Sequence, residues 1–240
     1  MKPIVVVVCL FLFFLYGCSQ QNEKSSMLDK KIYEFSWCSY KDGFKAQDLN
    51  NELISYLGFL KNLKDQHGLY KETKYLDPSF KQKKYDFSWL DIFENELEKN
   101  AFYEFAENSE IYKNWLSSKD EIIVCDSQKQ SFYETQVVND YEFLDGDQTY
   151  IGFCRLKDGF DMNYLISDMR SNSIFVDRPY NQAVLTPDFN FIDFNFLIFL
   201  ETNFVVNELN LLRKNGLENA CEEYENYSTN SLLFDTYIID

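Results

Sequence analysis

Short stretches of this chain alternate apolar and polar residues, and longer stretches repeat apolar residues every three or four positions. Tyr33, Phe35 and Trp37 alternate with polar neighbours, which predicts a strand. Leucines then recur on one helical face through residues 49–60, which predicts an amphipathic helix. A second alternation through residues 85–93 predicts an aromatic strand that leads into another helix.

Two segments of the chain recur in the same order, which indicates an internal repeat. Residues 38–44, Cys-Ser-Tyr-Lys-Asp-Gly-Phe, return as residues 154–160, Cys-Arg-Leu-Lys-Asp-Gly-Phe. Residues 86–92, Asp-Phe-Ser-Trp-Leu-Asp-Ile, return as residues 188–194, Asp-Phe-Asn-Phe-Ile-Asp-Phe. Two ordered matches are unlikely to arise by chance, so we predict two structural units of similar fold.

The predicted units cover residues 31–138 and 148–240, and a turn-rich linker at 139–147 joins them. Each unit has the order strand, helix, two strands, helix, strand, which is the split βαβ of ferredoxin-like folds. Helices on one face of such an antiparallel sheet leave its other face apolar and uncovered. We therefore predict an α+β protein in which two tandem ferredoxin-like units pack sheet against sheet.

This element order, together with the duplication and the aromatic third strand, resembles the dimeric α/β-barrel superfamily of antibiotic-biosynthesis monooxygenases and NIPSNAP proteins. The resemblance covers nearly all of residues 31–240 and implies a pseudo-dimeric α/β barrel, but it transfers no catalytic residue. Haem-degrading relatives use an axial histidine. The single histidine here, His67, lies in a polar stretch that is typical of an exposed loop. We therefore expect no cofactor and no metal site.

The start of the chain carries a separate signal. An apolar run from Ile4 leads into residues 15–18, Leu-Tyr-Gly-Cys, which resemble the lipobox of bacterial lipoproteins. The run is shorter than the roughly 20 residues of a membrane-spanning helix, so a permanent transmembrane anchor is disfavoured. A plain secretory signal is the competing interpretation.

The lipobox resemblance implies a signal peptide at residues 1–17, a lipid on Cys18, and a flexible tether at residues 18–30. Ser19 follows the lipidated cysteine and implies sorting to the outer membrane, facing the periplasm. The net charge of −16 would repel nucleic acid phosphates and anionic lipid headgroups. We therefore expect membrane contact through the lipid alone and no nucleic acid partner.

Two aspartates in the repeated aromatic strand are candidates for chemistry. Asp91 and Asp193 share a strand face with aromatic residues, and burial inside a barrel would raise their pKa values toward general acid or base use. The alternative, which we favour, is that each is a strand-end acid that reaches water or caps the next helix. The aromatic residues expected to line the barrel are Trp37, Phe87, Trp89, Phe153, Phe189 and Phe191.

Four cysteines would remain in an oxidising compartment beside Cys18, and such a compartment favours disulfides. The first and last strands of a ferredoxin-like unit are neighbours, so we predict a disulfide between Cys38 and Cys125. Phe234 takes the place of Cys125 in the second unit, so we interpret Cys154 and Cys221 as buried thiols and leave open whether they pair.

Two functions stay open at this point. The first is a non-enzymatic envelope lipoprotein that binds an apolar small molecule or an envelope protein. The second is a cofactor-independent monooxygenase-like enzyme, in which barrel aromatics and a carboxylate position an electron-rich substrate. No histidine-based triad and no glycine-rich phosphate loop is recognisable in the sequence.

Overall fold

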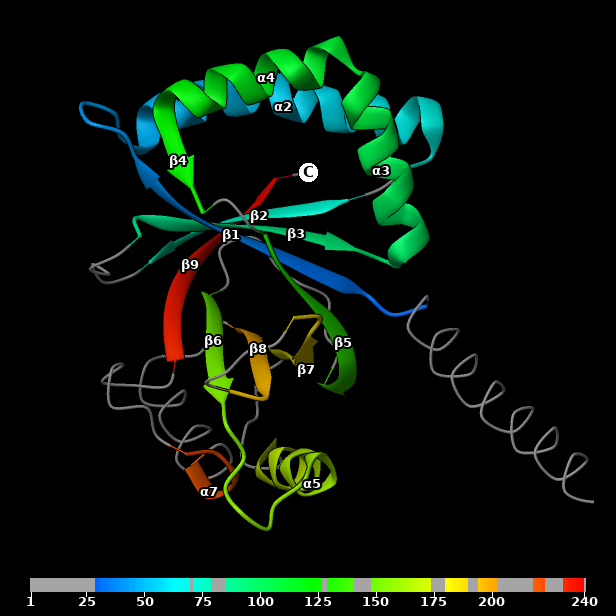
Figure 1. Ribbon diagram of the computed structural model, residues 1–240, viewed down its shortest axis with the longest axis vertical. Coiled ribbons are helices and arrows are strands. Elements are labelled where there is room, and N and C mark those ends of the chain that lie inside the picture. Colours follow the sequence, from blue (N-terminus) through cyan, green and yellow to red (C-terminus); the bar gives the residue numbers. More distant parts are fainter. Residues whose placement is uncertain are drawn as a thin grey trace, which may run out of the picture.

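A closed antiparallel sheet lies between two layers of helix in a computed structural model of the chain (Figure 1). The structure describes residues 29–69, 71–78, 85–126, 129–139, 148–173, 180–189, 194–202, 218–222 and 231–239. Most of the predicted signal peptide, tether and linker therefore lies outside the described residues. No helix in the described part of the chain is long and apolar enough to cross a membrane.

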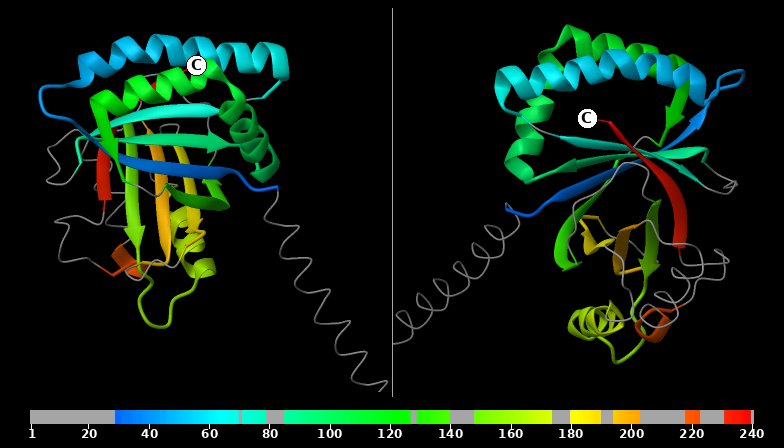
Figure 2. Two further views of the ribbon diagram at one scale, coloured as in Figure 1. Left: turned by 45° about the horizontal axis from the view of Figure 1, so that its top comes forward. Right: turned by 180° about the vertical axis from the view of Figure 1, so that it is seen from behind.

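The first unit supplies the longer helices, which run side by side over its sheet (Figure 2). Its elements are β1 (Ile32–Tyr40), α2 (Ala46–His67), β2 (Glu72–Pro78), β3 (Phe87–Phe93), α3 (Glu96–Asn108), α4 (Glu110–Ile122), β4 (Ile123–Cys125) and β5 (Gln130–Asn139). The side chains of Asn95 and Ser109 accept backbone N–H groups at the starts of α3 and α4. Gly68, in the left-handed conformation, ends α2.

The second unit repeats this order with fewer described helices. Its elements are β6 (Gln148–Cys154), α5 (Met162–Ser173), β7 (Tyr180–Pro187), β8 (Phe196–Thr202), α7 (Glu218–Ala220) and β9 (Ser231–Ile239). The first strand and the first helix predicted for the second unit are confirmed by β6 and α5. The next strand, expected near residues 173–176, falls mostly outside the described residues, and β7 begins at Tyr180.

The last strand of each unit crosses to the other unit and closes the barrel. β5 pairs with β1 of its own unit and with β7 of the second unit. In the same way β9 pairs with β6 and with β2 of the first unit. Because β1 also pairs with β3, all strands except the short β4 form a ring. The fold class predicted from the sequence is therefore confirmed.

Alternation along the strands separates the barrel interior from the outer, helix-covered faces. Tyr33, Phe35 and Trp37 point into the barrel, where they pack with residues of the second unit such as Leu197. Residues of opposite parity on the same strand, such as Cys38, face α2 and α4. A smaller third cluster lies under α5 and α7. Both faces of the first unit's sheet are thus buried.

The second sequence match is misaligned by seven residues. Phe87 lies opposite Cys38 in the β3–β1 pair, and Phe196 lies opposite Cys154 in the β8–β6 pair. The backbone amide of Asn195 bonds to the carbonyl of Cys154, as Asp86 does to Cys38. Residues 196–202, rather than 189–195, are therefore equivalent to β3. The second Asp-Phe pair, at residues 188–189, is a local similarity that comes just after β7.

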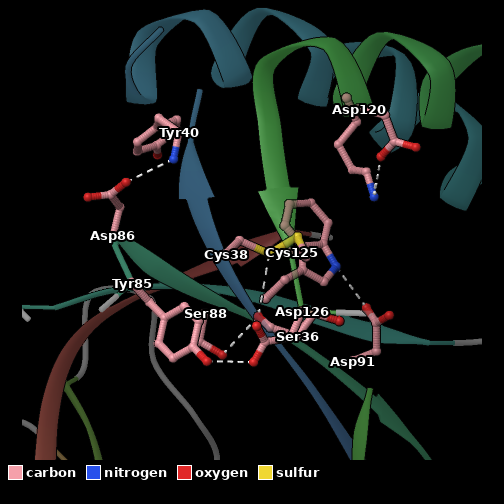
Figure 3. The surroundings of a disulfide bond; sticks show 12 residues. Ser36, Cys38, Tyr40, Tyr85, Asp86, Ser88, Asp91, Asp120, Cys125 and Asp126 are labelled. Atoms are coloured by element: carbon pink, nitrogen blue, oxygen red, sulfur yellow. Dashed lines mark hydrogen bonds and ion pairs between the residues drawn. A yellow bond between two sulfur atoms is a disulfide. The ribbon is translucent and has the colours of Figure 1, made fainter. Parts of the chain in front are cut away.

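Each unit carries a disulfide on the cysteine of its repeated motif. The predicted Cys38–Cys125 disulfide is confirmed, and it joins β1 to β4, where the two residues lie opposite each other (Figure 3). Cys154 and Cys221 form a second disulfide, so their interpretation as thiols is wrong. Phe234 is not the counterpart of Cys125, because Phe234 belongs to β9, which corresponds to β5 rather than to β4.

These disulfides close loops with sequence separations of 87 and 67 residues. Loops of that length lower the entropy of the unfolded chain and stabilise the fold by about 4 to 5 kcal/mol each in the chain-entropy model. Both disulfides tie the first strand of a unit to the segment that returns from the helix layer.

The fourth barrel strand of the first unit was missed in the sequence. The final strand was expected to end at Cys125, but α4 continues to Ile122 and the barrel strand is β5. Register shifts between Glu134 and Gln136, and again between Val137 and Asn139, interrupt the alternation along β5. A bulged strand does not alternate apolar and polar residues with a period of two, so its sequence does not indicate a strand.

Candidate functional site

Three of the six predicted lining residues do belong to the barrel interior. Trp37 is part of the interior cluster, and Phe153 and Phe189 are half-buried against it. Phe87 and Trp89 are buried on the opposite face, beneath α2 and α4, so their prediction is wrong. Both lie opposite β1 residues of outward parity, and cross-strand neighbours share a face.

Phe191 and Asp193, the remaining candidates from the second aromatic segment, lie outside the described residues.

The interior aromatics form a connected row. The Trp37 ring lies 6.0 Å from the Phe35 ring and 5.8 Å from the Tyr85 ring, measured between centroids. Phe132 continues the row, with its centroid 5.6 Å from Phe35 and 5.5 Å from Phe189. Because Tyr85 and Phe189 are only partly buried, the row extends from the packed interior toward solvent.

A buried lysine lies elsewhere in the interior, between two carboxylates. The side chain of Lys74 is 1% exposed, pairs with Glu201 of the second unit, and lies 2.9 Å from Glu72. Burial would lower the pKa of Lys74, but the two carboxylates outweigh burial and raise that pKa. Burial raises the pKa of Glu201. The Lys74 ammonium opposes this effect but does not cancel it, because Lys74 is shared with Glu72, whose negative charge also raises the pKa of Glu201.

The surroundings of this lysine are rich in negative charge and in aromatic rings. The Tyr33 hydroxyl donates to Glu134 over 3.0 Å, and the Tyr33 ring lies 5.2 Å from that of Phe199. The Lys74 ammonium is 5.9 Å from the Phe199 ring centroid. Burial raises the pKa of Tyr33, and nearby glutamates raise it further. Tyr33 therefore stays protonated at neutral pH.

Asp91 lies outside the barrel, between the sheet and the helices. It is buried among aromatic residues, where its carboxylate contacts Lys71 at 2.9 Å and accepts hydrogen bonds from Thr73 and Trp89. Burial would raise the pKa of Asp91, but Lys71 and Lys129 outweigh burial and hold that pKa below its ordinary value. Asp91 therefore stays ionised and is not poised as a general acid or base.

The alternative interpretation of Asp91, as a helix cap or solvated strand end, is also wrong. Asn95 caps α3, with its side chain accepting the backbone N–H of Glu98 at 3.0 Å. Asp91 instead belongs to a network that includes Glu34, Tyr103 and Lys129. Burial raises the pKa of Tyr103, and the carboxylates of Asp91 and Glu34 raise it further.

Sequence reasoning missed the lysines that organise both charged groups. Lys71 lies just before β2 and Lys74 lies within it, and their side chains point to opposite faces of that strand. A signal was available, because charged residues in a strand between apolar neighbours must find buried partners. The partners themselves come from distant segments and cannot be read from local spacing.

The single histidine does not fit a histidine-ligated haem inside the barrel. His67 is the last residue of α2, and it is exposed, with its ring 4.4 Å from that of Phe105. It therefore lies at a helix end rather than in the predicted loop, and its ring packs on Phe105 of the helix side, outside the barrel. Among the described residues, no group of three or more His, Cys, Asp or Glu side chains could hold a metal ion.

Comparison with known proteins identifies the fold. No protein-family model matches the sequence, and no curated protein matches it either. Chlorite dismutase from Candidatus Nitrospira defluvii, in complex with imidazole, is similar in structure, with a TM-score of 0.55 and 10% identity over 88% of this chain and 92% of that one.

A protein from Fusobacterium nucleatum that is provisionally named a monooxygenase is also similar. Its TM-score is 0.58 at 10% identity, and the match covers 88% of this chain and 93% of that one. At this level of identity the similarity shows the fold alone. The chain therefore has the dimeric α/β-barrel fold, built here from two units of one chain.

Replacing Asp91 by Asn should destabilise the protein by about 3 kcal/mol at pH 7, because the variant leaves the buried ammonium of Lys71 without its carboxylate. A carboxyl with a lowered pKa binds fewer protons when folded, so its contribution is full at neutral pH and is lost on acidification. In urea titrations, the difference between the wild type and Asp91→Asn should narrow as the pH falls below the ordinary range of aspartate. Asp120→Asn, at an exposed ion pair, is the control and should change stability little at either pH.

Proposed function

We propose that this protein is an exported lipoprotein of the bacterial cell envelope whose barrel binds an apolar small molecule without catalysing a reaction. The observation that carries the binding function is the row of aromatic side chains that runs from Phe35 in the packed interior to half-buried Tyr85 and Phe189. Aromatic side chains that lead from a protein interior to its surface are typical of sites for apolar ligands.

The disulfides support export. Both units carry one, and disulfides persist in oxidising compartments such as the periplasm while they are rare in the bacterial cytosol. This agrees with the resemblance of residues 15–18 to a lipobox, which supports anchoring through Cys18. The outer membrane is the proposed location, with the domain facing the periplasm and the membrane contacted through the lipid.

The state of the buried acids supports a binding role over catalysis. Glu34, Asp91 and Glu201 each contact at least one lysine ammonium. A general base needs an oxygen that is free to take a proton from a substrate. The carboxylate that the sequence offered for this role, Asp91, is ionised and lies outside the barrel.

One observation favours an oxygenase-type enzyme as a second candidate. Glu201 is a carboxyl inside the barrel whose pKa is raised by burial, and it lies near the aromatic rings of Tyr33 and Phe199. Such a group could take a proton from an electron-rich aromatic substrate that then reacts with molecular oxygen. Similarity in fold to a provisionally named monooxygenase is compatible with this candidate.

Ligand binding can be measured with Trp37 as an internal reporter. The chain has three tryptophans, and Trp89→Phe with Trp115→Phe would leave Trp37 alone in the interior. We expect Nile red, a neutral apolar dye, to quench Trp37 fluorescence saturably in the chain lacking residues 1–18. Trp37→Phe, which keeps the two tryptophans under the helices, is the matched control and should show much weaker quenching.

Equal quenching in both variants, or none in either, would contradict binding at the aromatic row. Mass spectrometry of the purified protein separates the two candidate functions, because an apolar molecule recovered unchanged supports the binding module. An aromatic molecule recovered together with its oxygenated form would instead support the enzyme.

Lipid anchoring is tested by Cys18→Ser. Without this thiol no other group can accept the diacylglycerol, so the variant should stay an unlipidated precursor and incorporate no labelled fatty acid. Cys9→Ser is the matched control, because this residue lies within the predicted signal peptide and should leave labelling unchanged. Normally acylated mature protein in membranes of the Cys18→Ser strain would refute the anchor.

A further inference from the structure

Three of the four disulfide cysteines are buried in the folded protein. Cys38 is fully buried beneath α2 and α4, and Cys154 and Cys221 are 1% and 3% exposed in the cluster under α5 and α7. Cys125 is partly buried. Thiol–disulfide exchange requires direct contact between the attacking thiolate and the sulfur of its partner. Both disulfides therefore form before the cores close around them.

The two disulfides pair the cysteines in their order along the chain. Cys38 pairs with Cys125, and Cys154 pairs with Cys221, so each disulfide lies within one unit. When such a chain is exported from its N-terminus, the first cysteine of each pair reaches the periplasm first. The next cysteine to arrive is its native partner. Pairing in the order of arrival therefore gives the observed disulfides without a later rearrangement.

Loop closure in the unfolded chain favours a different pair. Cys125 and Cys154 are 29 residues apart, whereas the native partners Cys38 and Cys125 are 87 residues apart. The probability of closing a flexible loop falls with the 3/2 power of its length, so the shorter, non-native loop closes about fivefold more readily. The order of arrival protects the native pair, because Cys125 can react with Cys38 before Cys154 is exported.

Cys18 would disturb this order if it kept its thiol. It precedes Cys38 by 20 residues, so a loop between Cys18 and Cys38 closes about ninefold more readily than the native loop. Cys125 would then pair with the next cysteine, Cys154, and Cys221 would be left alone. A lipid on the sulfur of Cys18 prevents this shift, because exchange needs a thiolate.

We propose that diacylglyceryl transfer to Cys18 precedes oxidation of the chain by a periplasmic thiol oxidase, and that this sequence of reactions sets the disulfide pattern. The proposal rests on the lipid anchor proposed above and gives the lipid a second role, which is to keep Cys38 from a wrong partner.

The oxidase supplies the disulfide that is consumed in each reaction. The thiolate of the first cysteine attacks this disulfide and forms a mixed disulfide with the oxidase. The thiolate of the second cysteine then attacks the sulfur of the first and displaces the oxidase. For each disulfide the chain loses two electrons and two protons, and the oxidase is released as a dithiol.

The test compares two mature chains that are secreted behind a plain signal peptide cleaved before position 18. One chain keeps Cys18 and the other carries Cys18→Ser, and neither receives a lipid. Both chains and the wild type are produced in a bacterium without a periplasmic disulfide isomerase. Free thiols are alkylated, and the disulfides are identified by peptide mapping without reduction.

We expect both native disulfides in the Cys18→Ser chain and in the lipidated wild type. In the secreted chain that keeps Cys18, native pairing should fall about fivefold or more, because the shorter loops close first. That chain should instead contain disulfides from Cys18 to Cys38 and from Cys125 to Cys154, with Cys221 alkylated.

Equal native pairing in the two secreted chains would overturn the proposal, because Cys18 would then not compete for Cys38. Mispaired disulfides in the lipidated wild type would also overturn it, because the order of arrival would not set the pattern. Complete disulfides in the wild type from a strain without the thiol oxidase would exclude the oxidase. Failure of the anchor is detected separately, as absence of labelled fatty acid from the wild type.

Discussion

Strand exchange between the two units is the constraint on which the rest of the structure depends. β5 leaves the first unit to pair with β7, and β9 leaves the second unit to pair with β2. A single unit would expose both an apolar sheet face and unpaired strand edges, which are sites of aggregation. Closing the ring satisfies the backbone hydrogen bonds of both edges and buries the interior aromatics in the same step.

Closure also explains where charge is tolerated. Lys74 and Glu201 come from different units and meet only because the ring is closed. A buried ion pair rarely stabilises a fold relative to apolar side chains, yet removing one partner is strongly destabilising. The Asp91 network follows the same rule on the outer face, where α3 and β5 bring Tyr103 and Lys129 to carboxylates that β1 and β3 already hold.

The fold could be predicted from the sequence further than the site could. Alternation in β1, the repeated cysteine motif and the helix periodicity identified the ferredoxin-like units and the Cys38–Cys125 disulfide. The pattern could not show which face of β3 enters the barrel, because all seven of its residues are buried. Phe87 and Trp89 were therefore predicted on the wrong side of the sheet. The bulges in β5 interrupt its alternation, so the sequence did not predict this strand. The partners of Lys71 and Lys74 come from distant segments, which local sequence patterns do not show.

Native-state hydrogen exchange would test the closed barrel most directly. If strand exchange holds the molecule together, amides of β5 and β9 should exchange only through global unfolding, with the same free energy as amides of β1 and β3. Denaturant should then unfold both units in one transition. Exchange of β5 and β9 at a clearly lower free energy, together with separate unfolding of the two units, would contradict this account.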